Sequence, residues 1–314
     1  MRISVTDRCN LRCTYCMPEE GIVSVSHDRI LRYADILRIC RIGAALGIHR
    51  IKLTGGEPLV RRGVVGLIRE IKAISGIEQV TMTTNGVLLA AMYDDLVDAG
   101  LDAVTISLDT LNREKFRTLT RRDALPEVLA GLEKAVQEGR IPVKINCVAM
   151  ADTTAEEFLE IAELARQANV HVRFIELMPI GLGKEGSGWA EDRLMAVLEN
   201  RYGTLHPYDG RLGNGPARYV EIEGFCGKIG WISAVSHAFC SDCNRVRLTS
   251  EGFLKCCLQY NRGVDLRPSL SQEDDGALLA AMREGILMKP EHHSFGLRHV
   301  IPEEESRKMS QIGG

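Results

Sequence analysis

The chain has 314 residues, of which 45% are apolar and 26% charged, and its formal net charge is -3. This is the composition of a globular protein with ample material for a core. The nearly balanced charge and the 5% aromatic content argue against a surface that binds nucleic acid. No apolar run approaches the roughly 20 residues of a membrane helix, and the polar start MRISVTDRCN is no signal peptide. We therefore expect a cytoplasmic protein with no nucleic-acid or membrane partner.

Short apolar strands alternate with amphipathic helical segments from the N-terminus to about residue 178. We expect helices that include residues 30–45, 64–74, 127–137 and 155–168. Repeated β-then-α units of this kind predict parallel strands with helical crossovers. The six expected strands span residues 2–6, 50–54, 80–83, 103–109, 143–148 and 172–177.

One face of these strands is polar along almost the whole series. In the second strand, for example, Lys52 and Thr54 alternate with Ile51 and Leu53. A parallel strand covered by helices on both faces is apolar throughout. We therefore predict an α/β fold, a partial (β/α)6-type TIM barrel whose helices lie outside and whose polar faces line the lumen. An open sheet with one solvated face is the alternative.

The segment 209–217 is rich in Gly and Asn and predicts a junction. We assign residues 1–208 to the barrel. Residues 209–314 form a smaller α+β region, with an expected strand pair at 218–223 and 228–233.

Ten cysteines in a cytoplasmic chain indicate metal or redox chemistry, because a reducing compartment does not keep structural disulfides. Cys9, Cys13 and Cys16 form C-x3-C-x2-C directly after the first strand. This spacing fits neither paired zinc motifs nor four-cysteine ferredoxin motifs. Three thiolates can hold a 4Fe–4S cluster with one open iron, whereas Cys40 and Cys147 lie in apolar contexts and are expected in the core.

A second group, Cys240, Cys243 and Cys257, also offers three thiolates, as C-x2-C-x13-C. It predicts a second cluster with an open iron. Cys256 is an alternative third ligand on spacing alone. A structural zinc remains the other reading, since further ligands are available at Cys226, His237 and Cys256.

The segment CNLRCTYC at 9–16 resembles the radical S-adenosylmethionine (SAM) signature, with an aromatic residue before its last Cys. TGGEP at 54–58 resembles the element that receives the methionyl amine of SAM in that superfamily. The resemblance implies SAM contacts at Tyr15, Gly55, Gly56, Glu57, Ser107 and Met178.

The segment HAFCSDCNRVRLT at 237–249 and the final Gly-Gly resemble the MoaA family of radical SAM enzymes, and the resemblance covers essentially the whole chain. It implies two 4Fe–4S clusters facing one cavity, where the first cleaves SAM and the second holds GTP. It favours Cys257 as the third ligand. The implied GTP contacts are Arg2, Lys52, Thr83, Lys144, Arg173, Arg245, Val246 and Arg247.

The strand cations Arg2, Lys52, Lys144 and Arg173 independently indicate a bound anion, because an unpaired buried charge is costly. A triphosphate supplies that anion, and Arg is well suited to bidentate phosphate contacts. The chain contains no P-loop motif.

The resemblance implies a GTP 3',8-cyclase, a lyase that catalyses the first step of molybdenum cofactor biosynthesis. A 5'-deoxyadenosyl radical would remove hydrogen from C3' of GTP, and C3' would then attack C8 to give 3',8-cyclo-7,8-dihydro-GTP. The implied partners are an external electron donor and a downstream pterin-forming enzyme, with a homodimer among the expected assemblies. The alternatives are another radical SAM enzyme with an auxiliary cluster, such as a peptide-modifying one, and a non-catalytic two-cluster electron-transfer protein.

The C-terminal Gly313 and Gly314 present bare backbone, which can enter a space that a Cβ would block. We expect both glycines to enter the cavity and to order the SAM or GTP site.

Overall fold

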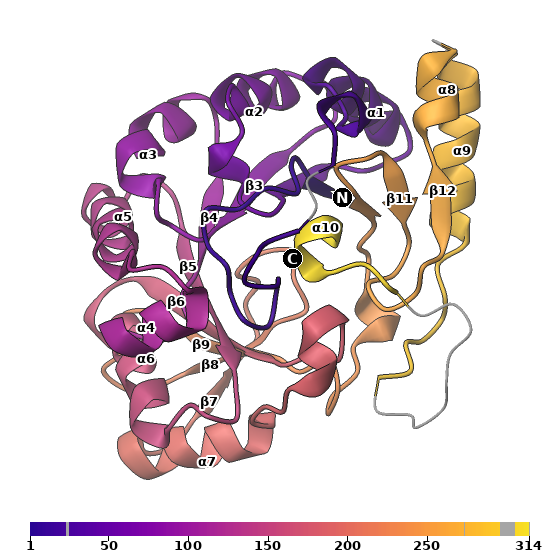
Figure 1. The fold of residues 1–314 in the computed structure, drawn as a ribbon. Helices are drawn as coiled ribbons and strands as arrows, with labels where there is room; N and C mark the ends of the chain where they lie inside the picture. Colours follow the sequence, from indigo (N-terminus) through magenta and orange to yellow (C-terminus); the bar gives the residue numbers. More distant parts are fainter. Residues whose placement is uncertain (23–24, 273, 296–304, 314) are drawn as a thin grey trace.

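The structure is a computed structural model that describes residues 1–22, 25–272, 274–295 and 305–313. Its centre is a run of six parallel strands that neighbour one another in chain order, which confirms the predicted partial barrel (Figure 1). These strands are β1 (Arg2–Ser4), β2 (Arg50–Thr54), β3 (Gln79–Thr84), β4 (Ala103–Ser107), β5 (Val143–Ala149) and β6 (Val170–Glu176).

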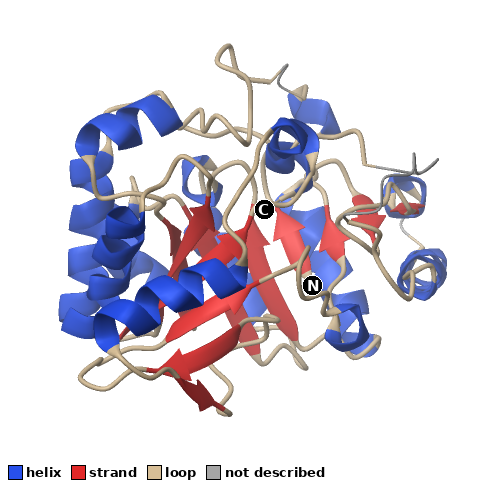
Figure 2. Cartoon of the chain, turned by 90° about the horizontal axis from the view of Figure 1, so that it is seen from below, coloured by secondary structure: helices blue, strands red, loops and turns tan. Residues whose placement is uncertain are grey.

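Helices cover only the outer face of these strands, as the views in Figures 1 and 2 show. Several begin where the sequence supplies a cap: Asn112 caps α4, and Thr154 forms a capping box with Glu157 at α6. Pro126 lies in the first turn of α5, where its missing N–H costs nothing. The helices are α1 (Tyr33–Ala45), α2 (Val64–Lys72), α3 (Leu89–Asp98), α4 (Arg113–Thr120), α5 (Leu125–Glu138) and α6 (Ala155–Gln167).

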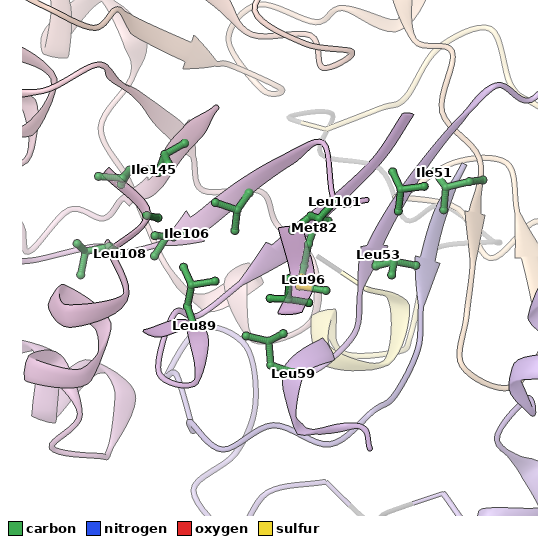
Figure 3. Close-up of a cluster of buried hydrophobic side chains, with 14 of the residues drawn as sticks. Ile51, Leu53, Leu59, Met82, Leu89, Leu96, Leu101, Ile106, Leu108 and Ile145 are labelled. Carbon is green, nitrogen blue, oxygen red and sulfur yellow. The ribbon is translucent and has the colours of Figure 1, made fainter. Parts of the chain in front are cut away.

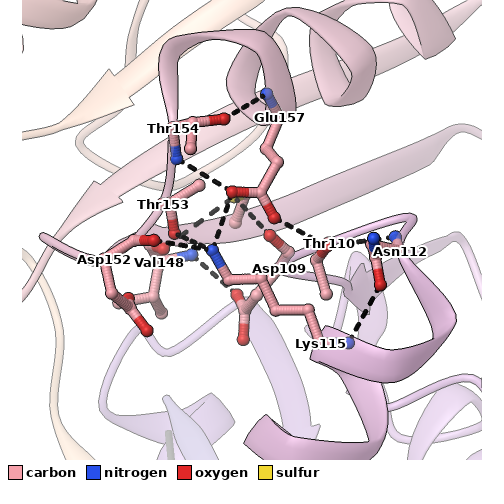
Figure 4. Close-up of polar contacts among 10 residues, drawn as sticks. Asp109, Thr110, Asn112, Lys115, Val148, Asp152, Thr153, Thr154 and Glu157 are labelled. Atoms are coloured by element: carbon pink, nitrogen blue, oxygen red, sulfur yellow. Dashed lines mark hydrogen bonds and ion pairs between the residues drawn. The ribbon is translucent and has the colours of Figure 1, made fainter.

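A polar cluster ties the ends of α4 and α6 to the barrel (Figure 4). Lys115 of α4 donates to Glu157 of α6 at 2.8 Å, and the same carboxylate accepts the N–H of Thr154. Nearby, Asp109 after β4 accepts the N–H of Val148 in β5 at 2.8 Å. These contacts fix the loops that follow β4 and β5, at the end of the barrel where active sites of such folds lie.

The rest of the chain extends the sheet at both of its edges, giving one 12-stranded sheet. β9 (Ile229–Ile232) pairs with β6 and continues through β8 (Arg218–Glu221) to β7 (His206–Tyr208). This confirms the predicted strand pair. At the other edge β10 (Arg247–Leu248) pairs with β1 and continues through β11 (Phe253–Lys255) to β12 (Gly263–Asp265). The predicted boundary near residue 208 stays a prediction.

The remaining helices lie mostly around the C-terminal region. They are α7 (Glu191–Tyr202), α8 (Arg267–Ser271), α9 (Asp275–Leu287), α10 (Met309–Ile312) and the 3-10 turns η1 (His27–Arg29), η2 (Pro58–Val60), η3 (Gly181–Glu185) and η4 (Cys240–Asp242). No helix in the described ranges is long and apolar enough to cross a membrane.

The two faces of the strands differ as the alternation predicts. Leu53, Met82 and Ile106 are fully buried in the layer between strands and helices, where Figure 3 shows them. The inner face carries Thr105 at 3% and Arg173 at 7% relative exposure. The polar face is therefore enclosed, and the alternative of an open sheet with a solvated face is wrong. Cys40 and Cys147 are buried in the core, as predicted.

Truncating the outer core should destabilise the fold. Leu96 on α3 is fully buried, so we expect Leu96→Ala to lower the free energy of unfolding by about 2–5 kcal/mol, measured by urea denaturation. Leu287, which is 75% exposed, is the matched control. Leu287→Ala should change the free energy of unfolding by less than about 0.5 kcal/mol. Equal effects of the two substitutions would contradict this core assignment.

Candidate functional site

A cavity of about 300 Å³ opens at the carboxyl ends of the barrel strands. Its wall contains all six cysteines of the two three-cysteine groups. The groups are far apart in sequence. The sheet topology brings them together because β10, which lies between Cys243 and Cys257 of the second group, pairs with β1, which precedes the first. The structure therefore places two candidate metal-binding groups on one cavity.

The loop that carries the first cysteine group is held by backbone contacts to the end of α4. The N–H groups of Arg12 and Thr14 donate to the carbonyls of Thr120 and Leu119, each at 2.9 Å. Arg121 then donates its Nη1 to the carbonyl of Arg12 at 3.0 Å. Arg121 has φ 54°, the only positive value among described residues other than Gly, a conformation that costs energy and is kept where the surroundings require it.

The glycines of the TGGEP loop allow close approach to this cysteine loop. A Cβ on Gly55 would lie 2.7 Å from the Thr6 carbonyl oxygen, and one on Gly56 would lie 2.3 Å from that of Arg8. The N–H of Gly56 donates to the Thr6 carbonyl at 2.7 Å. The two glycines are therefore required by a close contact between two loops of the protein. The sequence pattern did not predict this role.

Glu57 is buried and already accepts hydrogen bonds within the protein. Its carboxylate receives the Thr84 hydroxyl and the N–H of Asn85, both at 2.7 Å, and the N–H of Leu59 at 3.0 Å. Burial raises its pKa to about 7, although these hydrogen bonds favour the ionised form. Carboxylate oxygens offer about four acceptor positions, so one remains for a ligand in the cavity.

Asn85 and Asp109 line the cavity although sequence reasoning did not identify them. Asn85 donates its Nδ2 to Asn10 at 2.7 Å and lies 3.7 Å from the Cys9 sulfur. Asp109 accepts the Tyr15 hydroxyl at 2.7 Å. Asn85 directly follows β3 and Asp109 lies two residues after β4, and this position of polar residues at strand ends could have indicated them. Of the other predicted SAM contacts, Ser107 and Met178 also line the cavity.

The second cysteine group lines the same cavity, beside Lys289. The Lys289 ammonium group is 3.4 Å from the Cys243 sulfur, and the N–H of His293 is 3.3 Å from that of Cys240. Cys256, by contrast, is fully buried, and its thiol faces the carbonyls of Arg262 and Met288. This leaves Cys257 as the residue of the adjacent pair whose thiol is not committed to those carbonyls.

The two groups differ in electrostatic environment. Burial raises the pKa of the Cys9, Cys13 and Cys16 thiols, to about 12 at Cys16. Burial also acts to raise the pKa of Cys243, but Arg245 and then Lys289 outweigh it and lower that pKa to about 7. The second group is therefore the more cationic of the two sites.

The donor set fits iron–sulfur clusters. Within the ranges that the structure describes, no three His, Cys, Asp or Glu side chains converge on a single metal ion. A structural zinc requires four ligands at one point, whereas each thiolate of a cluster binds its own iron. Each of the two groups places three cysteines on the cavity wall. This arrangement suits clusters that keep one iron open to a ligand.

Besides Lys289 next to Cys243, five cations line the cavity, and among the described residues none of these five makes an ion pair with Asp or Glu. Burial and then neighbouring cations lower the pKa of Lys52 and Arg2 well below their usual values. The buried Nε of Arg173 has no hydrogen-bond partner. This concentration of positive charge suits a polyanionic ligand. The five are Arg2, Lys52, Arg173, Arg245 and Arg247.

Two of the predicted GTP contacts do not line the cavity. Thr83 lines the cavity, but Lys144 and Val246 do not. The Lys144 ammonium group lies against Gly213, deeper along the strands, where a Cβ on that glycine would be 2.7 Å away. Val246 is buried, and its carbonyl accepts the N–H of Arg2. Their roles as ligand contacts stay predictions.

The C-terminal tail reaches the same place. Met309 and Ser310 line the cavity, and the Gly313 carbonyl accepts Arg247 Nη1 at 2.6 Å. Gly313 has φ 79°, and a Cβ there would lie 2.6 Å from Thr54 Oγ1, so the position requires glycine. Gly314 lies outside the described residues.

The contact between the glycine loop and the cysteine loop makes a testable prediction. Gly56→Ala should displace the Arg8 backbone and reduce iron bound at the first cysteine group to about half or less, since no side chain can yield there. Anaerobic reconstitution followed by iron analysis in a Cys240→Ala background, which isolates the first group, measures this. Gly66→Ala on α2 is the control, because its Cβ would meet nothing within 4 Å. Unchanged iron in the Gly56 variant would rule out this role.

Comparison with known proteins agrees with this geometry. The model of the radical SAM superfamily matches residues 3–165, and the model named molybdenum cofactor synthesis C matches residues 170–295. The GTP 3',8-cyclases of Syntrophomonas wolfei and Heliobacterium modesticaldum are 45% and 44% identical over 321 residues. Each match covers 100% of this chain and 97% of the relative.

Solved structures agree in fold. HydG, a maturase of the [FeFe]-hydrogenase, has a TM-score of 0.51 at 16% identity, over 63% of this chain and 48% of HydG. A tagged form of anSMEcpe with bound AdoMet has a TM-score of 0.50 at 18% identity, over 64% of this chain and 58% of that protein. The chain belongs to the radical SAM superfamily and, over its whole length, to the GTP 3',8-cyclase family.

Proposed function

We propose that this protein is a radical SAM GTP 3',8-cyclase, which converts GTP to (8S)-3',8-cyclo-7,8-dihydroguanosine 5'-triphosphate in the first step of molybdenum cofactor biosynthesis. The identity of 44–45% to such cyclases over the whole chain supports the activity. The observation in the structure that carries the proposal is the set of five cations, without carboxylate partners among the described residues, on a cavity shared by both cysteine groups.

The cysteines divide into two sets on one cavity. Cys9, Cys13 and Cys16 would hold the first 4Fe–4S cluster, and Cys240, Cys243 and Cys257 would hold the second. When bound, the first cluster and SAM supply the 5'-deoxyadenosyl radical that starts the reaction. The SAM contacts are proposed at Tyr15, Gly55, Gly56, Glu57, Ser107 and Met178.

The chain's own residues bind and orient the substrate. Arg2, Lys52, Arg173, Arg245 and Arg247 would neutralise the triphosphate, with Thr83 beside them and Lys144 and Val246 as further predicted contacts. Holding ribose C3' near SAM and the base near the second cluster supplies orientation, which accounts for a large part of catalysis when the cofactors carry the chemistry. The protein also excludes water, because the inner face of the barrel is enclosed.

The reaction also needs partners. An external electron donor would supply the electrons, and a downstream pterin-forming enzyme would consume the product. A homodimer is the assembly we propose to test by light scattering.

Anaerobically reconstituted enzyme, given SAM, dithionite and GTP deuterated at C3', tests the activity. We expect deuterium in the released 5'-deoxyadenosine and a cyclised isomer of GTP in chromatography with mass spectrometry. Release of 5'-deoxyadenosine that does not require GTP but does require a peptide would favour a peptide-modifying enzyme. No release at all, with both clusters loaded, would favour an electron-transfer protein.

The two cysteine groups should lose different steps. Cys13→Ala should abolish SAM cleavage while the second cluster keeps its iron, and Cys243→Ala should stop cyclisation while SAM cleavage continues. Cys256→Ala should be nearly silent, because that thiol faces two backbone carbonyls. Loss of SAM cleavage in Cys243→Ala protein with an intact first cluster would contradict the division.

The cations should act on the phosphates. Arg173→Ala should weaken GTP binding by about 1.5–3 kcal/mol, the scale of a hydrogen bond to a charged group, and should affect guanosine much less. Calorimetry on reconstituted enzyme measures both ligands. Arg218, which pairs with Glu191 at 2.7 Å, is the control, and Arg218→Ala should leave both affinities unchanged. Equal losses for GTP and guanosine would mean that Arg173 supports the fold.

A further inference from the structure

Part of the tail at residues 305–313 lines the cavity that carries both cysteine groups, through Met309 and Ser310. Its helix α10 is drawn inside the ring of barrel strands in Figure 1. The backbone of Ser310 is close enough to Cys16 to lower the pKa of its thiol, against the larger effect of burial, and the Gly313 carbonyl accepts Arg247 Nη1 at 2.6 Å. The tail therefore lies beside a cysteine of the first group and contacts a cation that stands between Cys243 and Cys257 of the second.

This tail cannot hold its own conformation. Helix α10 spans only Met309–Ile312, far below the roughly 12–15 residues that an isolated helix needs in water. Its position must come from contacts with the rest of the protein.

One such contact is a buried ion pair at the start of the described tail. Glu305 pairs with Lys255, the last residue of β11, and their side chains are 1% and 0% exposed. The N–H of Glu305 donates to the Gln259 carbonyl at 2.7 Å. Lys255 also donates to the Tyr260 carbonyl at 2.8 Å.

Arg307 strengthens the same contact from within the tail. Its Nε donates to Glu305 Oε1 at 2.9 Å, and its guanidinium lies 4.7 Å from the ring centre of Phe253 on β11. The Glu305 carboxylate thus lies between one cation from β11 and one from the tail.

Because both side chains are buried, each charge depends on the other for its stability. An ammonium group or a carboxylate removed from water is stable only with its partner in place, so Lys255 allows Glu305 little freedom. Glu305 is close in sequence to Ser310 and Gly313, so fixing Glu305 restricts where those two residues can lie. Lys255 directly precedes Cys256 and Cys257, which joins the tail to the loop of the second cysteine group.

We propose that the Lys255–Glu305 ion pair is the anchor that positions the C-terminal tail in the cavity and couples it to the second cysteine loop. Both are positioning residues, acting through Ser310 and Gly313. The effect of the anchor on turnover rests on the proposed cyclase function, but its effect on the tail does not.

Hydrogen–deuterium exchange of the reconstituted holoenzyme, followed by mass spectrometry, tests the anchor without requiring catalysis. Glu305→Gln keeps the size of the side chain and removes its charge. We expect the amides of residues 306–313 to exchange about tenfold faster, while the barrel strands keep their protection. Lys255→Met should do the same, and Lys255→Arg should restore slow exchange because it retains the charge.

The Lys72–Asp102 pair provides matched controls, since it is partly buried, has a separation of 2.7 Å and lies away from the cavity wall. Asp102→Asn and Lys72→Met should leave tail exchange unchanged. If Lys255→Met fails to fold, Glu305→Gln carries the test, because Glu305 lies outside the cysteine loop.

Turnover gives the second readout. Glu305→Gln should keep the iron of both clusters and the SAM cleavage rate but raise the ratio of 5'-deoxyadenosine to cyclised GTP about fivefold or more, because a displaced tail leaves the radical unproductive. Unchanged tail exchange in Glu305→Gln, or loss of second-cluster iron in that variant, would overturn the proposal. A wild-type enzyme that forms no cyclised GTP while the tail results hold would overturn the proposed function alone.

Discussion

The burial of positive charge without carboxylate partners among the described residues is the constraint on which the rest of this structure depends. Arg2, Lys52 and Arg173 project from separate strands toward one cavity, and burial and mutual repulsion lower the pKa of Lys52 and Arg2. Such an arrangement costs folding free energy, which the outer apolar layer must offset. Evolution keeps a costly feature of this kind where a ligand compensates it, and a triphosphate does so.

The same constraint explains why the barrel is incomplete. A closed and filled barrel packs its interior with branched apolar side chains and has no room for two ligands. Here β1 and β6 are each extended by strands from the C-terminal region instead. These strands bring the second cysteine group, Arg245 and Arg247 to the open side. The lumen thus gains a second wall whose chemistry differs from the first.

The sequence was sufficient to predict the six parallel strands of the barrel and the two three-cysteine groups. Alternation within the strands indicates which face is polar, and cysteine spacing is a local property that needs no tertiary contact. Three features could not be predicted. The glycines of TGGEP contact another loop of the protein, Asp109 accepts the hydrogen bond of the Tyr15 hydroxyl, and Glu305, near the end of the chain, pairs with Lys255. Each depends on segments that only the fold brings together, and no local pattern encodes such pairing.

The pairing of β1 with β10 has a consequence for how the protein is made. Arg2 of β1 lies beside Arg247 of β10. β1 is the first strand to leave the ribosome, so it cannot pair with β10 until most of the chain has been synthesised. Contacts of such long sequence separation form late, because loop closure must precede them. The first cysteine loop needs only β1, β2 and α4. It can therefore assemble before the second cysteine group has been synthesised. In the growing chain this loop is therefore accessible to whatever delivers iron and sulfide before the β1–β10 pairing brings the second cysteine group to the same cavity.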